Sequence, residues 1–202
     1  YTALISKEGD MTYGLADMEV FDYITPEFLI KRSHLLKKAK CIIVDLNLGK
    51  EALNFLCAYT TKHQIKLVIT TVSSPKMKNM PDSLHAIDWI ITNKDETETY
   101  LNLKIESTDD LKIAAKRWND LGVKNVIVTN GVKEVTGAGD SFCAAVVYSW
   151  LNGMSTEDIL IAGMVNAKKT IETKYTVRQN LDQQQLYHDM EDYKNGKFTK
   201  VY

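Results

Sequence analysis

Residues 136–147 read TGAGDSFCAAVV, and this stretch decides how the rest of the chain is interpreted. The apolar run after its aspartate predicts a helix, so the two glycines lie in the first turn. Amides in a first turn lack a partner within the helix, and the helix dipole favours negative charge there. The backbone of Gly137, Ala138 and Gly139 therefore predicts an anion hole. Asp140 beside it is a candidate general base that takes a proton from a hydroxyl attacking a phosphorus atom, the alternative being a first-turn acid favoured by the dipole.

Upstream of this stretch, short apolar runs alternate with helical segments. We expect strands at 41–44, 65–69, 88–92 and 125–128, and helices at 50–63, at 93–101 and from Ser107 to Gly122. Other helices are expected from Thr25-Pro26 to about Lys38, and as a pair separated by Gly153, the second capped by Ser155. Strands that are apolar throughout, with helices between them, predict a parallel sheet covered on both faces. Trp89, Trp118 and Trp150 are expected in the core, and the polar tail from Asn180 is expected to form a surface helix with a frayed end.

Both ends of this α/β pattern carry a further expectation. Residues 1–17 have the alternation and the central turn of a β-hairpin, and residues 18–202 are expected to form the α/β domain. The chain begins in what resembles the middle of a strand, so we expect an N-terminally incomplete chain. The join between Asn130 and the glycine stretch is short for a crossover, so a loop is expected to be missing near 132–134; the alternative is a very short connection.

The composition and the cysteines favour a cytoplasmic protein. The chain has 202 residues, 45% of them hydrophobic and 25% charged, which is enough for one sizeable core. Its net charge of −1 gives no reason to expect nucleic-acid or membrane binding, and no apolar run reaches the length of a membrane span. We expect the three cysteines, Cys41, Cys57 and Cys143, to be buried and reduced. The four histidines share no metal-ligand spacing and are expected on the surface: His34, His63, His85 and His188.

The string TGAGDSF at residues 136–142 resembles the signature of the ribokinase-like (PfkB) carbohydrate kinases. Asn93-Lys94-Asp95-Glu96 is similar to the family's Asn-x-x-Glu motif, and Thr129-Asn130-Gly131 to its strand-end turn. These motifs follow one another in the family order. The resemblance implies a three-layer α/β/α fold with a mostly parallel central sheet, plus a small β lid partly present as residues 1–17. The N-terminal part of that fold, which carries the sugar-gripping residues, is not in the sequence.

The resemblance also implies roles for individual residues, with ATP as phosphate donor. Asn93 and Glu96 would hold Mg²⁺ against the phosphates, Glu96 through water, the alternative being a helix cap with its capping-box partner. Thr129, Asn130 and Gly131 would meet the nucleotide, although an ordinary turn at Asn130-Gly131 is the alternative. Asn166 would contact adenine, or else is a polar residue on a half-exposed helix. Glu134 lies where the family often has a monovalent-cation loop, but with that loop interrupted a K⁺ site is left open.

Within the family, several stretches resemble the pseudouridine kinase branch: residues 16–18, 24–29, 39–47 and 51–53, and Val72-Ser73 with Lys76. This implies ATP-dependent phosphorylation of the 5′-hydroxyl of pseudouridine. The alternatives are a kinase for another ribose-type sugar or nucleoside, and a non-catalytic relative that senses a nucleotide or sugar. Thr70-Thr71 stand where that branch carries Asp-Pro. If that aspartate helps to place metal or phosphate, its loss either argues against this branch or shifts the role to Glu96. Because exposed strand edges invite pairing, a homodimer through the lid strands is expected.

Overall fold

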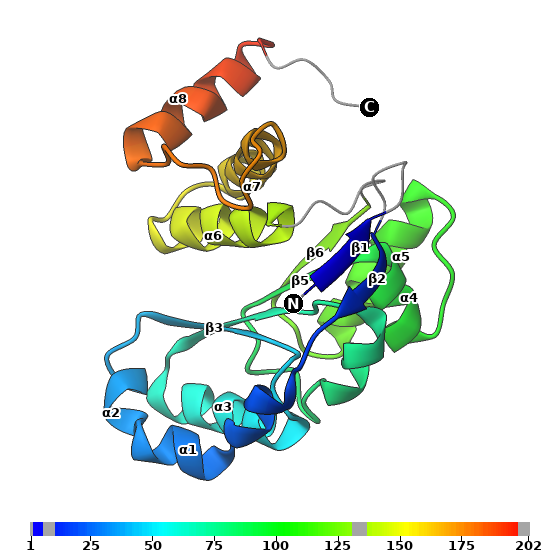
Figure 1. Cartoon of the computed structure of the whole chain (residues 1–202), viewed down its shortest axis with the longest axis vertical. Coiled ribbons are helices and arrows are strands. Elements are labelled where there is room, and N and C mark those ends of the chain that lie inside the picture. The colour runs from blue at the N-terminus through cyan, green and yellow to red at the C-terminus, as the bar shows by residue number, and fades with distance from the viewer. Residues whose placement is uncertain (1, 6–10, 131–136, 198–202) are drawn as a thin grey trace. The chain divides into compact units, whose positions relative to one another are not determined.

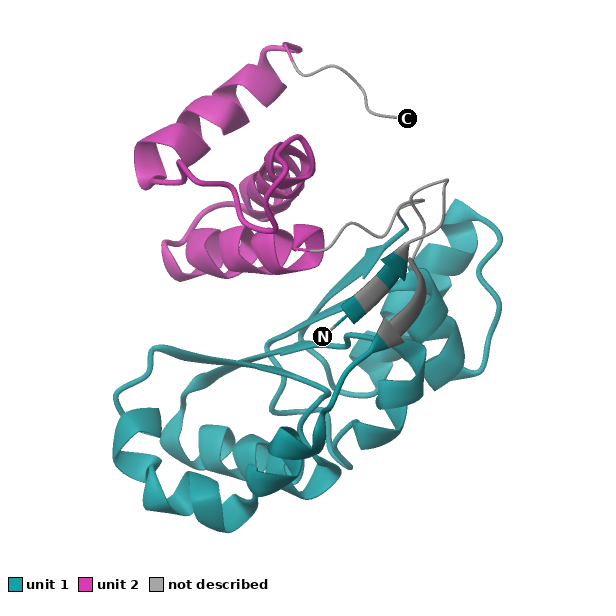
Figure 2. Ribbon diagram, in the orientation of Figure 1, with its two compact units in different colours: residues 1–132 teal, residues 133–202 magenta. Residues whose placement is uncertain are grey.

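A computed structural model describes residues 2–5, 11–130 and 137–197. The chain divides into two compact units, residues 1–132 and 133–202, and each is described by itself (Figure 2). Gly131 and Glu134, like the predicted missing loop, lie outside the described residues. The expected boundary at residue 17 and the missing N-terminal part stay predictions.

The first unit contains a parallel sheet of four strands (Figure 1). Its strands are β3 (Cys41–Asp45), β4 (Lys66–Thr70), β5 (Trp89–Asn93) and β6 (Asn125–Thr129), and they lie in sequence order. Asp45 pairs with Thr70, and Asn93 pairs with Thr129, so the carboxyl ends of the strands share one edge of the sheet. The predicted α/β class with a parallel sheet is confirmed.

Helices of the first unit bury apolar side chains against one face of this sheet. They are α3 (Lys50–His63), α4 (Lys94–Leu101) and α5 (Thr108–Asp120). Leu53 and Leu56 of α3, with Trp118 of α5, form one buried cluster with sheet residues including Leu67 and Ile90. Each such side chain contributes about 1.5–3 kcal/mol on burial, so this layer fixes the sheet that carries the site.

Burial along the strands follows the prediction in the centre of the sheet but not in β3. Leu67, Val68 and Ile69 of β4 are fully buried, as expected for a strand covered on both faces. In β3, Ile43 is 49% exposed, so the expectation of burial on both faces is wrong for this strand. β3 lies at an edge of the described sheet, with β4 as its only partner there, and such a strand loses cover that a central strand has.

The predicted helix from residue 26 to about residue 38 is two helices, α1 (Pro26–Lys31) and α2 (Ser33–Leu36). The guanidinium of Arg32 lies 3.6 Å from the centre of the Phe28 ring, and its Nη1 donates to the Phe28 carbonyl at 3.3 Å. That carbonyl is the acceptor an unbroken α-helix would give to the Arg32 amide, which donates to Leu29 instead. The side chain of Arg32 thus binds the carbonyl that the helix leaves unused where it breaks. Thr25 caps α1 as predicted.

The predicted hairpin precedes these helices in the chain, and a short helical connection joins two strands of the parallel sheet. β1 (Thr2–Ile5) and β2 (Met11–Leu15) are antiparallel, and the short 3₁₀ helix η1 (Glu19–Tyr23) follows them. A second 3₁₀ helix, η2 (Ser74–Asn79), lies between β4 and β5. The antiparallel pairing of the predicted hairpin is confirmed, its central turn lies outside the described residues, and its lid role stays a prediction.

The second unit consists of α6 (Ala138–Leu151), α7 (Thr156–Ile171) and α8 (Gln183–Lys194). The tail helix α8 was expected on the surface, but Leu186 and Met190 are buried with residues of α6 and α7. Asp189 is also buried and pairs with Arg178 at 2.7 Å. The prediction of a surface helix is nonetheless confirmed, because most residues of α8 are exposed and these few buried side chains form its packed face. Trp150 is half-buried rather than in the core.

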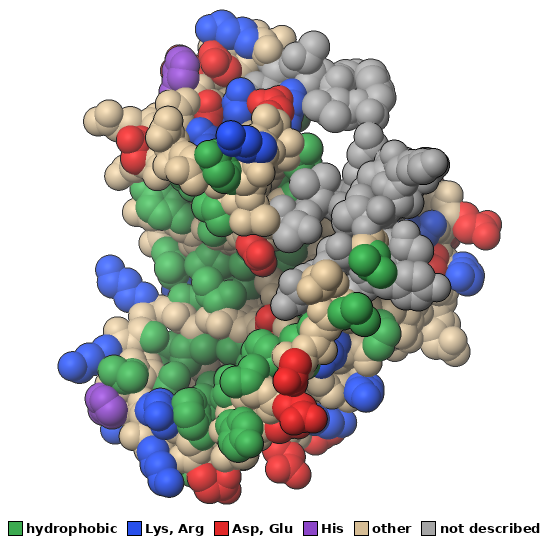
Figure 3. All heavy atoms as spheres, in the orientation of Figure 1, with side chains coloured by type: hydrophobic (Ala, Val, Ile, Leu, Met, Phe, Trp, Pro, Cys, Tyr) green, Lys and Arg blue, Asp and Glu red, His purple; other side chains and the backbone are tan. Residues whose placement is uncertain are grey.

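The surface agrees with the composition. On the face in Figure 3, basic and acidic side chains are interspersed rather than separated by sign. None of the three cysteines is in a disulfide; Cys57 and Cys143 are buried and Cys41 is half-buried. His34, His85 and His188 are exposed, and His63 is half-buried against Tyr59. None of the helices in the described ranges combines the length and apolarity that crossing a bilayer requires.

Candidate active site

The carboxyl edge of the parallel sheet brings together the predicted residues of the first unit. Ligands of open parallel sheets bind beyond the carboxyl ends of the strands. Asn93 ends β5 beside Thr129 at the end of β6, and the Thr129 hydroxyl donates to the Thr92 carbonyl at 3.3 Å. Asn130 follows and is exposed. The nucleotide roles predicted for Thr129 and Asn130 stay predictions, but the two residues stand at the edge where such a role is exercised.

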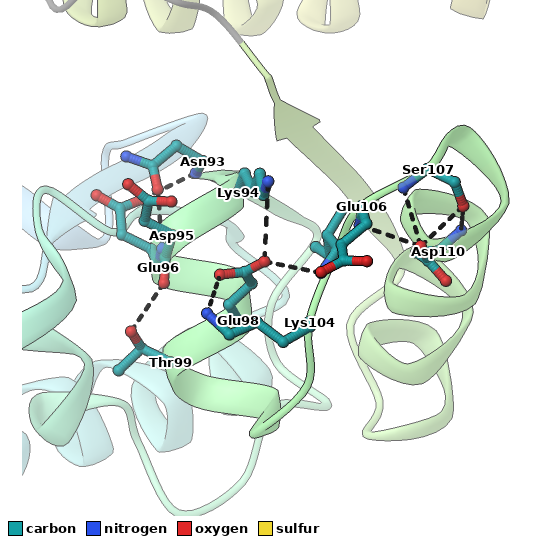
Figure 4. Close-up of polar contacts among 11 residues, drawn as sticks. Asn93, Lys94, Asp95, Glu96, Glu98, Thr99, Lys104, Glu106, Ser107 and Asp110 are labelled. Carbon is teal, nitrogen blue, oxygen red and sulfur yellow. Dashed lines mark hydrogen bonds and ion pairs between the residues drawn. The ribbon is translucent and has the colours of Figure 1, made fainter.

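Asn93 and Glu96 form a complete capping box at the start of α4 (Figure 4). The Glu96 amide donates to Asn93 Oδ1 at 2.8 Å, and the Asn93 amide donates to Glu96 Oε2 at 2.9 Å. The structural alternative for this motif is therefore present. It does not exclude a ligand role, because the cap uses only one oxygen of the carboxylate.

Glu96 is 4% exposed, and every hydrogen bond that its carboxylate makes in the described chain reaches the same oxygen. Oε2 accepts from the hydroxyls of Thr71 and Thr92 and from the Asn93 amide. The network continues from Thr92 to Thr97 at 3.3 Å and from Thr97 to the indole of Trp118 at 3.4 Å. Oε2 is thus held in place from several directions.

This donor set fits Mg²⁺. No described residue donates to Glu96 Oε1, which leaves one carboxylate oxygen for a metal-bound water. The described residues contain no group of three or more His, Cys, Asp or Glu side chains placed to hold a metal. Mg²⁺ is commonly held by one or two carboxylates while waters and substrate phosphates complete its shell. Glu96 can fill that position without a larger protein cage.

In the second unit, the N-terminus of α6 has open backbone amides. Gly137 is the N-cap, with φ of 87°, and has no side chain to cap the helix. The first helical hydrogen bond runs from the Ser141 amide to the Gly137 carbonyl at 3.0 Å, so the preceding amides lack helical acceptors. Asp140 is exposed in this turn, and its carboxylate has no partner among the described residues. The structure thus puts the predicted acid beside the predicted anion hole.

The two glycines of this turn differ in why they are needed. A Cβ on Gly137 would lie 1.9 Å from the Thr176 carbonyl oxygen, and the positive φ also disfavours a side chain. A Cβ on Gly139 would meet nothing within 4 Å. Gly137 is therefore required by the fold of the second unit, whereas Gly139 leaves open space above the helix end.

Asn166 of α7 is 1% exposed, and its amide nitrogen donates to the Ser141 carbonyl at 2.7 Å. The Thr170 hydroxyl lies within hydrogen-bond distance of both Ser141 Oγ and the Asn166 carbonyl, at 2.9 Å each. These contacts attach α7 to the residue that follows Asp140. Asn166 is itself buried on a partly exposed helix, which leaves its structural alternative open, and the adenine contact stays a prediction.

Thr71 was not among the predicted site residues, and its only mark in the sequence was a departure from a motif. The structure places its buried hydroxyl on Glu96, twenty-five positions later in the chain. Its position directly after the last residue of β4 was the signal available, because ligands of open parallel sheets bind beyond the carboxyl ends of the strands.

The family profile described as pfkB family carbohydrate kinase matches residues 1–135 and 132–183. The chain belongs to this family. A relative is the pseudouridine kinase of Escherichia coli, 24% identical over 176 residues, which are 76% of this chain and 56% of that enzyme. Another is the 1-phosphofructokinase of Borreliella burgdorferi, 29% identical over 63% of this chain and 47% of that one. The chain thus spans about half the length of the curated relatives it matches.

Solved structures of the family share the fold. A carbohydrate kinase from Agrobacterium tumefaciens has a TM-score of 0.77 at 20% identity, over 94% of this chain and 67% of that one. Arabidopsis thaliana ribokinase, solved with ribose and ATP, has a TM-score of 0.66 at 16% identity, over 80% of this chain and 59% of that one. The ribokinase-like fold predicted from the glycine stretch is confirmed.

Proposed function

We propose that the protein transfers the γ-phosphoryl group of ATP to the 5′-hydroxyl of pseudouridine. The observation that carries the proposal is the exposed carboxylate of Asp140 in a helical turn with open backbone amides. Membership of a carbohydrate kinase family supports phosphoryl transfer, and the likeness to a pseudouridine kinase supports the acceptor.

Asp140 acts as the general base in this proposal. Its carboxylate accepts the proton of the acceptor hydroxyl while that oxygen forms a bond to the γ-phosphorus. The bond between the γ-phosphorus and the β,γ-bridging oxygen breaks, and ADP leaves. The open amides of Gly137, Ala138 and Gly139 donate to the transferring group, where preorganised donors stabilise developing charge.

Glu96 and Asn93 are the residues that would hold Mg²⁺, with Glu96 acting through a bound water. The ion supplies charge neutralisation on the phosphate oxygens. The protein's own contribution is the fixed carboxylate: Oε2 is occupied by donors from two strand ends and from the helix cap, which keeps Oε1 in one place.

A second candidate acceptor is another ribose-type sugar or nucleoside. It is favoured by further relatives, among them a deoxyribokinase of Salmonella typhi at 21% identity and a ribokinase of Staphylococcus aureus at 23%. The test measures ADP release with pseudouridine, uridine, ribose, deoxyribose and fructose at equal concentrations. We expect pseudouridine to give the highest kcat/KM, and a preference for ribose or fructose by orders of magnitude would contradict the proposed acceptor.

The remaining candidate is a non-catalytic relative that senses a nucleotide or sugar. Such a protein has no need for an exposed carboxylate beside open amides, and the carboxylate of Asp140 is exposed at the start of α6. Nucleotide binding by the full protein without ADP release for any acceptor in the panel would favour the sensor.

We also propose a cytoplasmic location. Its support is that none of the three cysteines is in a disulfide, since thiols persist in a reducing compartment. Burial raises the pKa of Cys41 and of Cys57 to about 11, so both stay protonated at neutral pH. Fractionation of cells that express the protein tests the location, and recovery in the membrane or secreted fraction would contradict it.

A homodimer through the hairpin is proposed as well. β1 and β2 pair only with each other in the described sheet, and Leu4 and Leu15 are exposed. Exposed strand edges with apolar side chains favour pairing with a second copy. Sedimentation of the full protein at micromolar concentration is the test, and a monomeric mass would count against the dimer.

A further inference from the structure

The turn after β4 has an unusual backbone. Val72 has φ of 69°, which is rare for a β-branched residue. The Ser73 amide donates to the Thr71 carbonyl at 2.8 Å, so residues 71–73 close a three-residue γ-turn of the strained, positive-φ kind. Such strain persists only where the surroundings hold it, and it concentrates at functional sites.

Thr71 is the residue that anchors this turn. It is 1% exposed, and its amide donates to the Ile91 carbonyl at 3.3 Å across the sheet. Its hydroxyl has one proton and two acceptors within reach, Glu96 Oε2 and, at 3.4 Å, the Ile91 carbonyl. A carboxylate is the stronger acceptor, so the proton belongs on Glu96.

We propose that Thr71 is a positioning residue that fixes the Glu96 carboxylate for Mg²⁺-dependent ATP binding. The inference rests on the proposed kinase function. With Thr71, Thr92 and the Asn93 amide all on Oε2, the carboxylate cannot rotate, and Oε1 remains the oxygen available to a metal-bound water. The strained turn keeps the Thr71 hydroxyl on that carboxylate while Val72, 51% exposed, projects outward.

The alternative is that Thr71 only satisfies a buried group in the core. The chain offers a matched control for this alternative in Thr60 of α3. Thr60 is also fully buried, and its hydroxyl donates to the Leu56 carbonyl within its own helix at 2.8 Å. Thr71→Val and Thr60→Val remove the same group from equally buried positions, and only the first touches Glu96.

The experiment measures ATP binding by calorimetry on the full protein, with Mg²⁺ and with EDTA, for wild type, Thr71→Val, Thr71→Ser and Thr60→Val. We expect Thr71→Val to weaken Mg·ATP binding by about 10–100-fold, the range typical of residues that orient a metal ligand. Binding of metal-free ATP should not change. Thr71→Ser, which keeps the hydroxyl, should restore the affinity, and Thr60→Val should match wild type. Should Thr71→Val not fold, Thr71→Ala removes the hydroxyl without added bulk.

Each failure has a distinct signature. Equal Mg·ATP affinity in wild type and Thr71→Val overturns the positioning role and leaves the proposed function standing. An equal loss of Mg·ATP and metal-free ATP binding in Thr71→Val also overturns it, because the effect would not involve the metal. A wild-type protein that binds ATP in neither condition overturns the proposed function, and the positioning role with it.

Discussion

Two helix N-termini in this molecule carry residues that the sequence suggested for phosphate chemistry, and they are built in opposite ways. At α4, Asn93 and Glu96 close a capping box, and the Glu96 side chain is buried. At α6, Gly137 offers no cap, and Asp140 is exposed. Capping satisfies amides that would otherwise seek an acceptor. The first helix end therefore fixes one carboxylate, whereas the second has no side-chain cap and is the end for which we propose an anionic ligand.

The largest expected effect comes from the acid at the open end. Asp140→Asn should lower turnover by about 10²–10⁴-fold, the usual contribution of a general base. ATP binding and thermal stability should be nearly unchanged, because the side chain is exposed and lacks a partner in the described chain. Steady-state kinetics, calorimetry and thermal melting check these three quantities.

Glu157→Gln is the matched control for Asp140→Asn. Glu157 is an exposed acid in the first turn of α7, in the same unit, and lies outside the proposed machinery. Turnover should not change in this variant. Unchanged turnover in Asp140→Asn itself would contradict the general-base role, and the two helix ends would then not differ in function.

The next largest effect on turnover is expected at Gly139, and it distinguishes this glycine from Gly137 at the N-cap of α6. Gly139→Ala should fold, because its Cβ meets nothing within 4 Å and alanine is the better helix former by up to about 1 kcal/mol. Its turnover should fall by up to about 10²-fold, approaching the loss of one oxyanion donor, because a methyl group would obstruct the approach of a phosphate to the amides.

Gly137→Ala should lose activity because the second unit is destabilised, and not because a phosphate is obstructed. Its Cβ would overlap the Thr176 carbonyl, so the second unit should lose stability before catalysis is affected. Urea denaturation of both variants beside the ADP-release assay separates the two causes. Full activity in Gly139→Ala would mean that no phosphate closely approaches the helix end.

A smaller effect is expected at the closed end. Asn93→Ala removes the cap acceptor for the Glu96 amide and should lower the free energy of unfolding by about 1 kcal/mol. Ser107→Ala at α5, which has the same kind of box with Asp110, is the control for capping alone. Both variants should melt lower, and only Asn93→Ala should also weaken Mg·ATP binding. Equal ligand binding in the two would reduce the α4 box to a purely structural feature.

The sequence predicted both helix ends but not the difference between them. The strands and helices were predictable because apolar runs and caps such as Ser107 and Ser155 act locally. The shared carboxyl edge followed from parallel pairing. The Asn-x-x-Glu spacing is the same for a capping box and a metal ligand, so the sequence left both open, and the structure contains the box.

What could not be predicted depends on contacts distant in the chain. The bond from Thr71 to Glu96 joins residues twenty-five positions apart, and no local pattern encodes it. The exposure of Ile43 depends on the position of β3 as an edge strand of the sheet. The packing of α8 depends on two buried apolar residues in an otherwise polar segment. The break at Arg32 required knowing that its side chain bonds to the Phe28 carbonyl. Each error arises where tertiary partners override local preference.

The smallest effect concerns a third helix end, at α5, where a carboxylate acts as cap without any proposed ligand. Hydrogen bonds from Ser107, and from the backbone of Glu106 and Ser107, lower the pKa of Asp110 from its ordinary value of 3.8. A carboxyl with a lowered folded-state pKa stabilises the protein above its unfolded value and loses that contribution as the pH falls through the folded one. The stability difference between wild type and Asp110→Asn should therefore be constant near neutral pH and shrink below about pH 4. Urea denaturation at pH 6 and pH 3 measures it, with Asp109→Asn, in the same turn but outside the box, as the comparison. A stability difference between wild type and Asp110→Asn that does not change with pH would show that this carboxylate acts through its shape and not through its charge. The capping box of α5 could then not be compared with that of α4 as a box held by a charged carboxylate.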